Sequence, residues 1–143
     1  GAHGRKKDLF AIWAAHDPAY VATVSPSEPL DLARKVEKAK AMKGPRLIIA
    51  LAPCPTGWLY DPEHSVEIGH LAVKSGLWPL KEAVNGEVVH TYFPKLSPVE
   101  DYLKLQGRFR HLFEPIVQQD AIAHIQDRVN TYWERVKQTE RKA

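Results

Sequence analysis

The chain has 143 residues, of which 44% are hydrophobic and 26% charged, a balance typical of one soluble globular domain and unlike that of disordered, collagen-like or coiled-coil chains. The formal net charge is +3 and most basic residues alternate with acidic ones, so we expect no nucleic-acid partner. One cysteine excludes an internal disulfide framework, and no apolar run approaches the roughly 18 residues that span a bilayer, so we expect a cytoplasmic protein with no membrane partner.

A short helix is the first predicted element. Asp8 is a suitable N-cap for a helix over residues 9–15. Three apolar side chains share one side of this helix: Leu9, Ile12 and Trp13.

Residues 20–52 predict a strand, a helix and a second strand. Residues 20–24 are rich in β-formers, and Pro29 is tolerated in the first turn of a helix that ends near residue 43, before Gly44 and Pro45. Residues 47–52 are continuously apolar, which predicts a strand buried on both faces, as in a parallel sheet. The helix residues expected to face the core are Leu32, Val36 and Ala39.

A helix and a hairpin follow. Asp61 and Pro62 predict a helix start, and Gly76 predicts its end. Asn85-Gly86 joins residues 77–84 to residues 87–92 and predicts a β-hairpin, because both turn positions accept positive φ. The helix residues expected to pack are Val66, Gly69, Leu71 and Val73.

Two helices complete the predicted fold. Ser97 and Glu100 match a capping box for a helix that continues to about residue 112. Pro115 is expected to open the last helix, which is either packed on its own domain or a docking arm for a partner, and the pattern favours neither. Its apolar stripe comprises Ile122, Ile125, Val129, Tyr132, Trp133 and Val136.

The segment 52–58 (Ala-Pro-Cys-Pro-Thr-Gly-Trp) is the most informative in the sequence. It follows the second strand, at the sheet edge where ligands gather in open α/β sheets. Prolines flank Cys54 and fix two φ angles, and Gly57 permits a tight reversal. We therefore expect a rigid loop that presents one sulfur.

Three interpretations of Cys54 remain open. It is a small buried hydrophobe, as free cysteines often are, a nucleophile, or a ligand of a metal or an iron–sulfur cluster. No histidine lies at a spacing that names it as a base for a nucleophile. A zinc site with His64 and His70 is poorly supported, because residues six apart on a helix point about 120° away from each other. No phosphate-binding loop or paired carboxylates occur, so we assign no catalytic residue.

An ordered set of motifs resembles the C-terminal half of the beta subunit of pyruvate:ferredoxin oxidoreductases and related 2-oxoacid:ferredoxin oxidoreductases. The motifs are Ala-His at 15–16, Tyr-Val-Ala-Thr at 20–23, Arg-Lys-Val at 34–36, Gly-Pro at 44–45, Leu-Ala-Pro-Cys-Pro-Thr-Gly-Trp at 51–58, Ala-Val-Lys-Ser-Gly-Leu-Trp-Pro-Leu at 72–80 and Tyr-Leu-Lys-Leu-Gln-Gly-Arg-Phe at 102–109. The resemblance implies the C-terminal half of a thiamine diphosphate-binding α/β domain over residues 1–112. Residues 113–143 form a helical extension of open role.

The resemblance also implies a reaction and partners. The family decarboxylates a 2-oxoacid oxidatively, with pyruvate expected here, forms acyl-coenzyme A and passes electrons through [4Fe-4S] clusters to ferredoxin. Its cofactors are thiamine diphosphate, Mg²⁺ and [4Fe-4S]. Cys54 corresponds to one ligand of the cluster nearest the thiamine, with the other ligands outside this chain. The expected partners are the N-terminal half of the beta subunit and the alpha, gamma and delta subunits.

This sequence departs from the family in lacking the Gly-Asp-Gly…Asn motif for Mg²⁺ and diphosphate and the upstream cysteines. We therefore expect the chain to bind no cofactor alone and to work as one part of a multi-chain enzyme. Two rival hypotheses remain: an independent α/β interaction module that docks a partner through its last helix, and a nucleic-acid binder. The second would use residues 5–7 together with Arg108 and Arg110.

Overall fold

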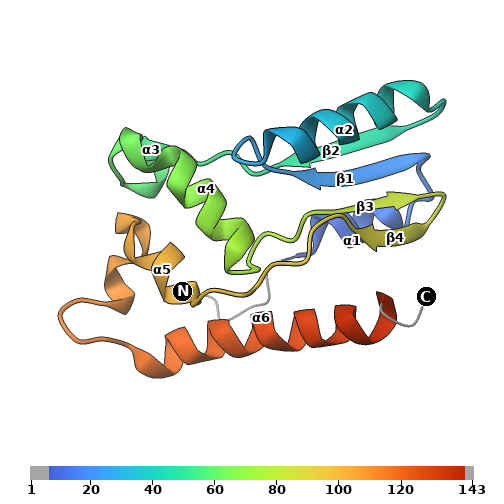
Figure 1. The fold of residues 1–143 in the computed structure, drawn as a ribbon. Helices are drawn as coiled ribbons and strands as arrows, with labels where there is room; N and C mark the ends of the chain where they lie inside the picture. Colours follow the sequence, from blue (N-terminus) through green and yellow to red (C-terminus); the bar gives the residue numbers. More distant parts are fainter. Residues whose placement is uncertain (1–6, 141–143) are drawn as a thin grey trace.

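A mixed four-stranded sheet forms the centre of the computed structural model, which describes residues 7–140 (Figure 1). The central strand β1 (Tyr20–Val24) is buried along its whole length, and β2 (Arg46–Ala50) pairs with it in parallel. On its other side, β1 pairs antiparallel with β3 (Lys81–Val84), which forms a hairpin with β4 (Glu87–His90). The strand order β2-β1-β3-β4 confirms the predicted α/β class, with a βαβ unit of partly parallel sheet followed by a hairpin.

The position of β2 corrects one prediction. Its apolar run predicts burial on both faces, but Leu47, Ile48 and Ile49 are only half-buried. The physical reason is that β2 lies at the edge of the sheet, where no described strand pairs with its outer side. An apolar strand with one free edge is a template for further pairing.

Helices cover the two faces of the sheet (Figure 1). Alternate side chains of β1 point to opposite faces, so Val21 packs with Phe10 of α1 (Leu9–Ala14), whereas Tyr20 packs with Ala39 of α2 (Pro29–Ala41). The predicted Asp8 cap is confirmed by a 3.0 Å hydrogen bond from the Ala11 amide. Helix α1 packs through Phe10, and the three apolar residues on its other side are exposed: Leu9, Ile12 and Trp13.

A buried lysine lies between α2 and the sheet, where the pattern predicts Leu32 and Val36. Both of those residues are only partly buried, while Lys35 is 2% exposed. The Lys35 ammonium donates to the Thr23 carbonyl at 2.9 Å and to the Asp31 carboxylate at 2.7 Å. These two acceptors satisfy the buried charge, as burial of an ammonium requires.

The next segment contains three short helical elements. They are α3 (Pro55–Trp58), a 3₁₀ turn η1 (Pro62–His64) and α4 (Ser65–Lys74). The Asp61 carboxylate caps η1 as predicted. Of the four residues expected to pack, Gly69 and Val73 are buried and Leu71 is partly buried, but Val66 is 61% exposed. Ile68 occupies the core in addition.

The hairpin turn is confirmed. Asn85 has φ 49° and Gly86 has φ 80°, so both turn residues adopt the left-handed conformation that the Asn-Gly pair predicts.

The start of α5 (Val99–Lys104) corrects the predicted capping box. The Ser97 hydroxyl is buried without a hydrogen-bond partner, and the Val99 amide donates to the Gln126 side-chain oxygen at 2.9 Å. The helix is therefore capped from the distant helix α6 (Gln119–Glu140) rather than locally. After α5 the chain forms the 3₁₀ segment η2 (Gly107–Leu112).

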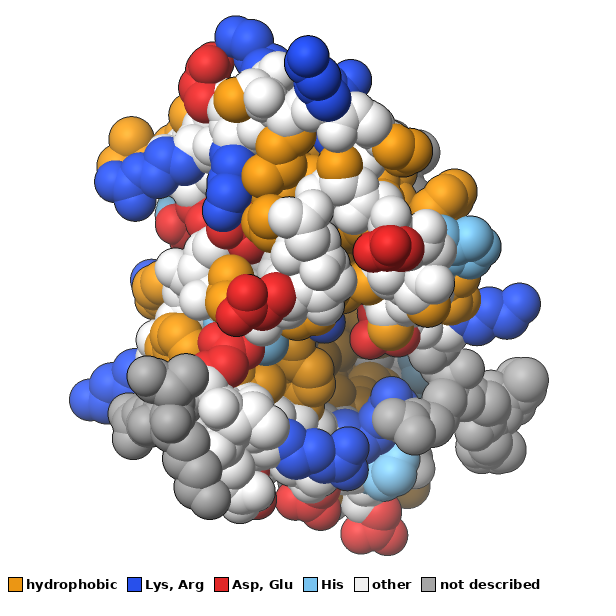
Figure 2. Space-filling view, turned by 90° about the vertical axis from the view of Figure 1, so that its right-hand side faces the viewer, with side chains coloured by type: hydrophobic (Ala, Val, Ile, Leu, Met, Phe, Trp, Pro, Cys, Tyr) orange, Lys and Arg blue, Asp and Glu red, His pale blue; other side chains and the backbone are white. Residues whose placement is uncertain are grey.

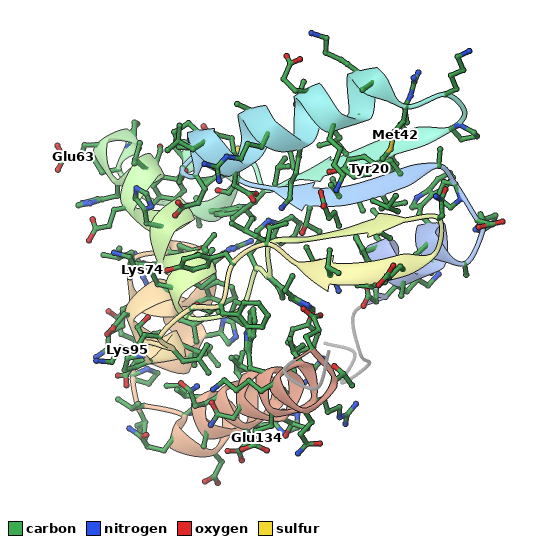
Figure 3. The ribbon with its side chains drawn as sticks, turned by 45° about the vertical axis from the view of Figure 1, so that its right-hand side comes forward. Tyr20, Met42, Glu63, Lys74, Lys95 and Glu134 are labelled. Carbon is green, nitrogen blue, oxygen red and sulfur yellow. The ribbon has the colours of Figure 1, made fainter. Side chains whose placement is uncertain are left out.

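Helix α6 packs along the protein's own core rather than extending away from it (Figure 1). It begins at Gln119, four residues later than predicted, but its apolar stripe faces inward as expected, with Trp133 donating to the Gly76 carbonyl at 3.1 Å. Glu134, labelled in Figure 3, lies on the outer side of the helix. No helix in the described part of the chain is long and apolar enough to cross a membrane.

Candidate functional site

Cys54 is exposed and lies at the N-terminus of the short helix α3. Its backbone is extended, at φ −120° and ψ 105°, and Pro55 occupies the first helical position, where a missing amide hydrogen costs nothing. The Cys54 side chain is exposed rather than packed in the core. The interpretation of Cys54 as a small buried hydrophobe is therefore wrong.

The Cys54 turn lies at the carboxyl edge of the parallel strands. The Leu51 amide donates to the Val24 carbonyl at 2.9 Å, which continues the β1–β2 pairing one residue past β2. The chain then turns into α3, which lies beyond the end of the sheet in Figure 1. The position matches the predicted ligand edge of an open α/β sheet.

Among residues 7–140, the sulfur of Cys54 has one hydrogen-bond partner, the Gly57 amide, which donates to Sγ at 3.3 Å. A Cβ at position 57 would lie 3.3 Å from the same sulfur, so glycine keeps the space beside Sγ open. A thiolate in this position retains free lone pairs and suits a soft metal ion or an iron–sulfur cluster.

Arg108 supports the Cys54 turn from η2, a role that the sequence does not signal. Its guanidinium stacks 3.7 Å from the centre of the Trp58 ring and 4.6 Å from that of Phe109. It also donates to the Gln106 side chain at 2.8 Å and to the Tyr102 hydroxyl at 3.0 Å. Arg108 therefore contacts other residues of the fold, which weighs against the rival hypothesis that it binds nucleic acid.

The surface charge does not favour nucleic-acid binding either. Figure 2 shows basic and acidic side chains interspersed over the face that it draws. Arg110 lies 3.7 Å from Glu114, so its charge is partly balanced. Residues 5 and 6 of the proposed basic group lie outside the described residues.

The histidines considered as zinc ligands have other partners. His64 Nδ1 forms a hydrogen bond with the Glu67 carboxylate at 2.9 Å, and His70 Nδ1 forms one with the Glu28 carboxylate at 2.9 Å. Within residues 7–140, no three His, Cys, Asp or Glu side chains form a group that could hold a metal ion, and no histidine bonds Cys54. Neither the zinc site nor a Cys–His nucleophile gains support. A cluster at Cys54 would need its remaining ligands from elsewhere.

A second polar cluster joins α6 to the β3–β4 hairpin. His90 contacts Glu140 at 2.5 Å and the Tyr132 hydroxyl at 2.7 Å, and Lys81 donates to the same hydroxyl at 3.2 Å. Burial lowers the pKa of Lys81 and of His90, while Glu140 opposes both shifts, and burial raises the pKa of Tyr132. The cluster fastens the last helix to the sheet and was not predicted.

The chain is similar in sequence to subunits of several oxidoreductases. It is 54% identical over 108 residues to pyruvate synthase subunit PorB of Methanocaldococcus jannaschii, a match that covers 75% of this chain and 36% of that protein. It is 48% identical over 122 residues to the PorB subunit of Methanosarcina barkeri, with 85% and 41% covered. The ketoisovalerate oxidoreductase subunit VorB of Pyrococcus furiosus is 40% identical over 135 residues, with 92% and 42% covered. No family model matches the chain.

The chain spans about two fifths of the length of these relatives. Identities of 40–54% over most of this chain confirm the resemblance that its motifs carry. Over the residues that align, the chain is therefore related to part of the PorB and VorB subunits.

Proposed function

We propose that the chain forms part of the beta subunit of a 2-oxoacid:ferredoxin oxidoreductase. The similarity to PorB and VorB subunits carries this proposal. The names of those relatives refer to pyruvate and to ketoisovalerate, which are both 2-oxoacids, and most of the matches are PorB subunits. Pyruvate is therefore the proposed substrate, with oxidative decarboxylation to acetyl-coenzyme A as the reaction and ferredoxin as the electron acceptor.

In this proposal, Cys54 supplies one thiolate to a [4Fe-4S] cluster. The fit rests on three features: Sγ is exposed, it lies at the carboxyl edge of the parallel strands, and it accepts only one hydrogen bond from the described part of the chain. Such clusters are commonly held by four cysteines, so the other three ligands come from outside this chain. A bound cluster would supply one-electron transfer.

The other residues of the turn have supporting tasks in the proposed site. The Gly57 amide directs a hydrogen towards the sulfur, and hydrogen bonds to cluster sulfurs help to set the reduction potential. The flanking proline at position 55 fixes φ and so limits the motion of the sulfur. We assign no residue of this chain to thiamine diphosphate or Mg²⁺, which the rest of the subunit would bind.

The surface of the sheet supports a place in an assembly. Strand β2 leaves its outer edge without a described partner strand, although Leu47, Ile48 and Ile49 are apolar. We propose that other parts of the beta subunit cover this edge and that the alpha, gamma and delta subunits complete the enzyme in the cytoplasm, where a free thiol stays reduced.

The direct test replaces the sulfur in the assembled oxidoreductase. Cys54→Ser is compared with Thr56→Ser, a conservative change at an exposed position in the same turn. Loss or alteration of one [4Fe-4S] signal in the electron paramagnetic resonance spectrum is expected for Cys54→Ser alone. An unchanged spectrum with full iron content would overturn the ligand role.

A further inference from the structure

The helix that carries Cys54 is too short to maintain its own shape. Helix α3 has four residues, and its backbone bonds include Trp58 to the Cys54 carbonyl at 2.8 Å and Tyr60 to the Pro55 carbonyl at 3.2 Å. Isolated helices below ~12 residues are marginal in water, because few hydrogen bonds offset the cost of nucleation. Contacts with the rest of the fold must therefore hold the turn in place.

The segment Gly107–Arg108 provides two such contacts. The Gly107 amide donates to the Leu59 carbonyl at 2.8 Å, and a Cβ at Gly107 would lie only 2.8 Å from that oxygen. Leu59, which ends α3, has φ 58°, a conformation that a leucine rarely adopts unless its surroundings impose it. The adjacent Arg108 guanidinium stacks on Trp58 at 3.7 Å.

Arg108 is itself held in one orientation. Gln106 is 1% exposed and accepts from Arg108 Nε, while its own amide nitrogen donates to the Tyr102 carbonyl at 2.6 Å. The Tyr102 hydroxyl accepts from a second guanidinium nitrogen at 3.0 Å. A planar guanidinium can stack and donate in two directions at once, which an ammonium group cannot do.

We propose that Arg108 is a positioning residue for the Cys54 turn, transmitting the fixed geometry of Tyr102 and Gln106 through Trp58 to the sulfur. The inference rests on the proposed cluster role of Cys54 and extends it. Arg108 acts through Trp58 on the turn, and the ligand itself is Cys54.

The test compares two arginines of η2 in the assembled enzyme. Arg108→Met removes the stack and both hydrogen bonds but keeps an unbranched apolar stem. Arg110→Met removes a mostly exposed arginine whose nearest carboxylate is 3.7 Å away. Amide hydrogen exchange over residues 54–60 is measured together with the midpoint potential and the paramagnetic spectrum of the cluster.

For Arg108→Met, exchange over residues 54–60 is expected to rise on the order of tenfold, as for loss of a partly buried cation–π contact, with a shifted potential. For Arg110→Met, both readouts should match the wild type. Arg108→Lys retains the charge without the planar stack and is expected to behave like Arg108→Met. A lysine variant identical to the wild type, or equal behaviour of both methionine variants, would overturn the positioning role.

The two proposals can fail separately. If Cys54→Ser leaves the cluster intact, the ligand role fails, whereas the exchange difference between the arginine variants still reports on positioning. If Cys54→Ser removes the cluster but Arg108→Met changes neither exchange nor potential, only the positioning inference fails.

Discussion

At the scale of single residues, Lys35 is a buried lysine whose ammonium group donates hydrogen bonds to two acceptors. Replacing it by Met keeps most of the side-chain volume but removes the bonds to Thr23 and Asp31. Since Asp31 is partly exposed and can recover water, we expect a loss of about 1–3 kcal/mol in the free energy of unfolding. Urea denaturation measures it.

Lys40→Met on the same helix is the matched control for Lys35. Its pair with Glu37 is exposed on both sides, so removing it should change the free energy of unfolding by about 0.5 kcal/mol or less. Equal losses for the two variants would show that the burial of Lys35 has no energetic consequence.

The lowered pKa of His90 leads us to predict how the free energy of unfolding depends on pH. Burial lowers its pKa in the folded state below the ordinary value of 6.5, with Lys81 adding to the shift and Glu140 opposing it. The unfolded chain therefore binds the proton more readily, and this site's contribution to stability is complete above pH 6.5 and decreases as pH falls towards the lowered pKa. His90→Gln should show a smaller decrease over that window.

The prediction for His90 is checked by urea unfolding at closely spaced pH values for the wild type and His90→Gln. The two proteins differ only at position 90, so the difference between the two curves isolates the effect of that residue. Parallel curves, or a wild type that gains relative stability on acidification, would contradict the lowered pKa.

At the scale of elements, the N-terminus of α5 distinguishes a local cap from a distant one. Gln126→Ala on α6 removes the acceptor of the Val99 amide, and we expect a loss of about 1 kcal/mol, typical of a lost N-cap. Ser97→Ala should cost little, because the Ser97 hydroxyl is buried without a partner. Thermal or urea unfolding of both variants measures the two losses in the free energy of unfolding. A larger loss for Ser97→Ala than for Gln126→Ala would support the local capping box instead.

The elements themselves were predictable where their signals are local. The Asn85-Gly86 turn and the Asp8 cap depend on residues that are close in sequence, and the structure shows both. The turn that presents Cys54 at the end of the sheet is likewise encoded by adjacent residues. The contacts of Lys35 with β1, of Gln126 with α5 and of Arg108 with Trp58 join distant segments. The spacing of apolar residues cannot predict such contacts. It indicates which side of a helix or strand is apolar but not which distant residues pack against that side.

At the scale of the whole molecule, the apolar composition of β2 and its edge position belong together. The run Leu47-Ile48-Ile49 predicts a strand buried on both faces, but β2 pairs only with β1 among the described strands and is half-buried. In the proposed assembly, other parts of the beta subunit would cover this strand. This agrees with a chain that spans about two fifths of its relatives.

The edge of β2 gives a prediction for the assembled enzyme. In the chain alone, amides of β2 that do not bond β1 face solvent and should exchange hydrogen quickly, whereas those of the buried strand β1 should be protected. When the remainder of the subunit is present, a strand paired with β2 should slow exchange over residues 46–50 by at least about tenfold, as burial of a ladder hydrogen bond requires. Strand β4, at the opposite edge, is the internal comparison. Slower exchange at both edges to the same degree would indicate general stabilisation, and unchanged exchange at β2 would show that this edge stays open in the enzyme, against the proposed mode of assembly.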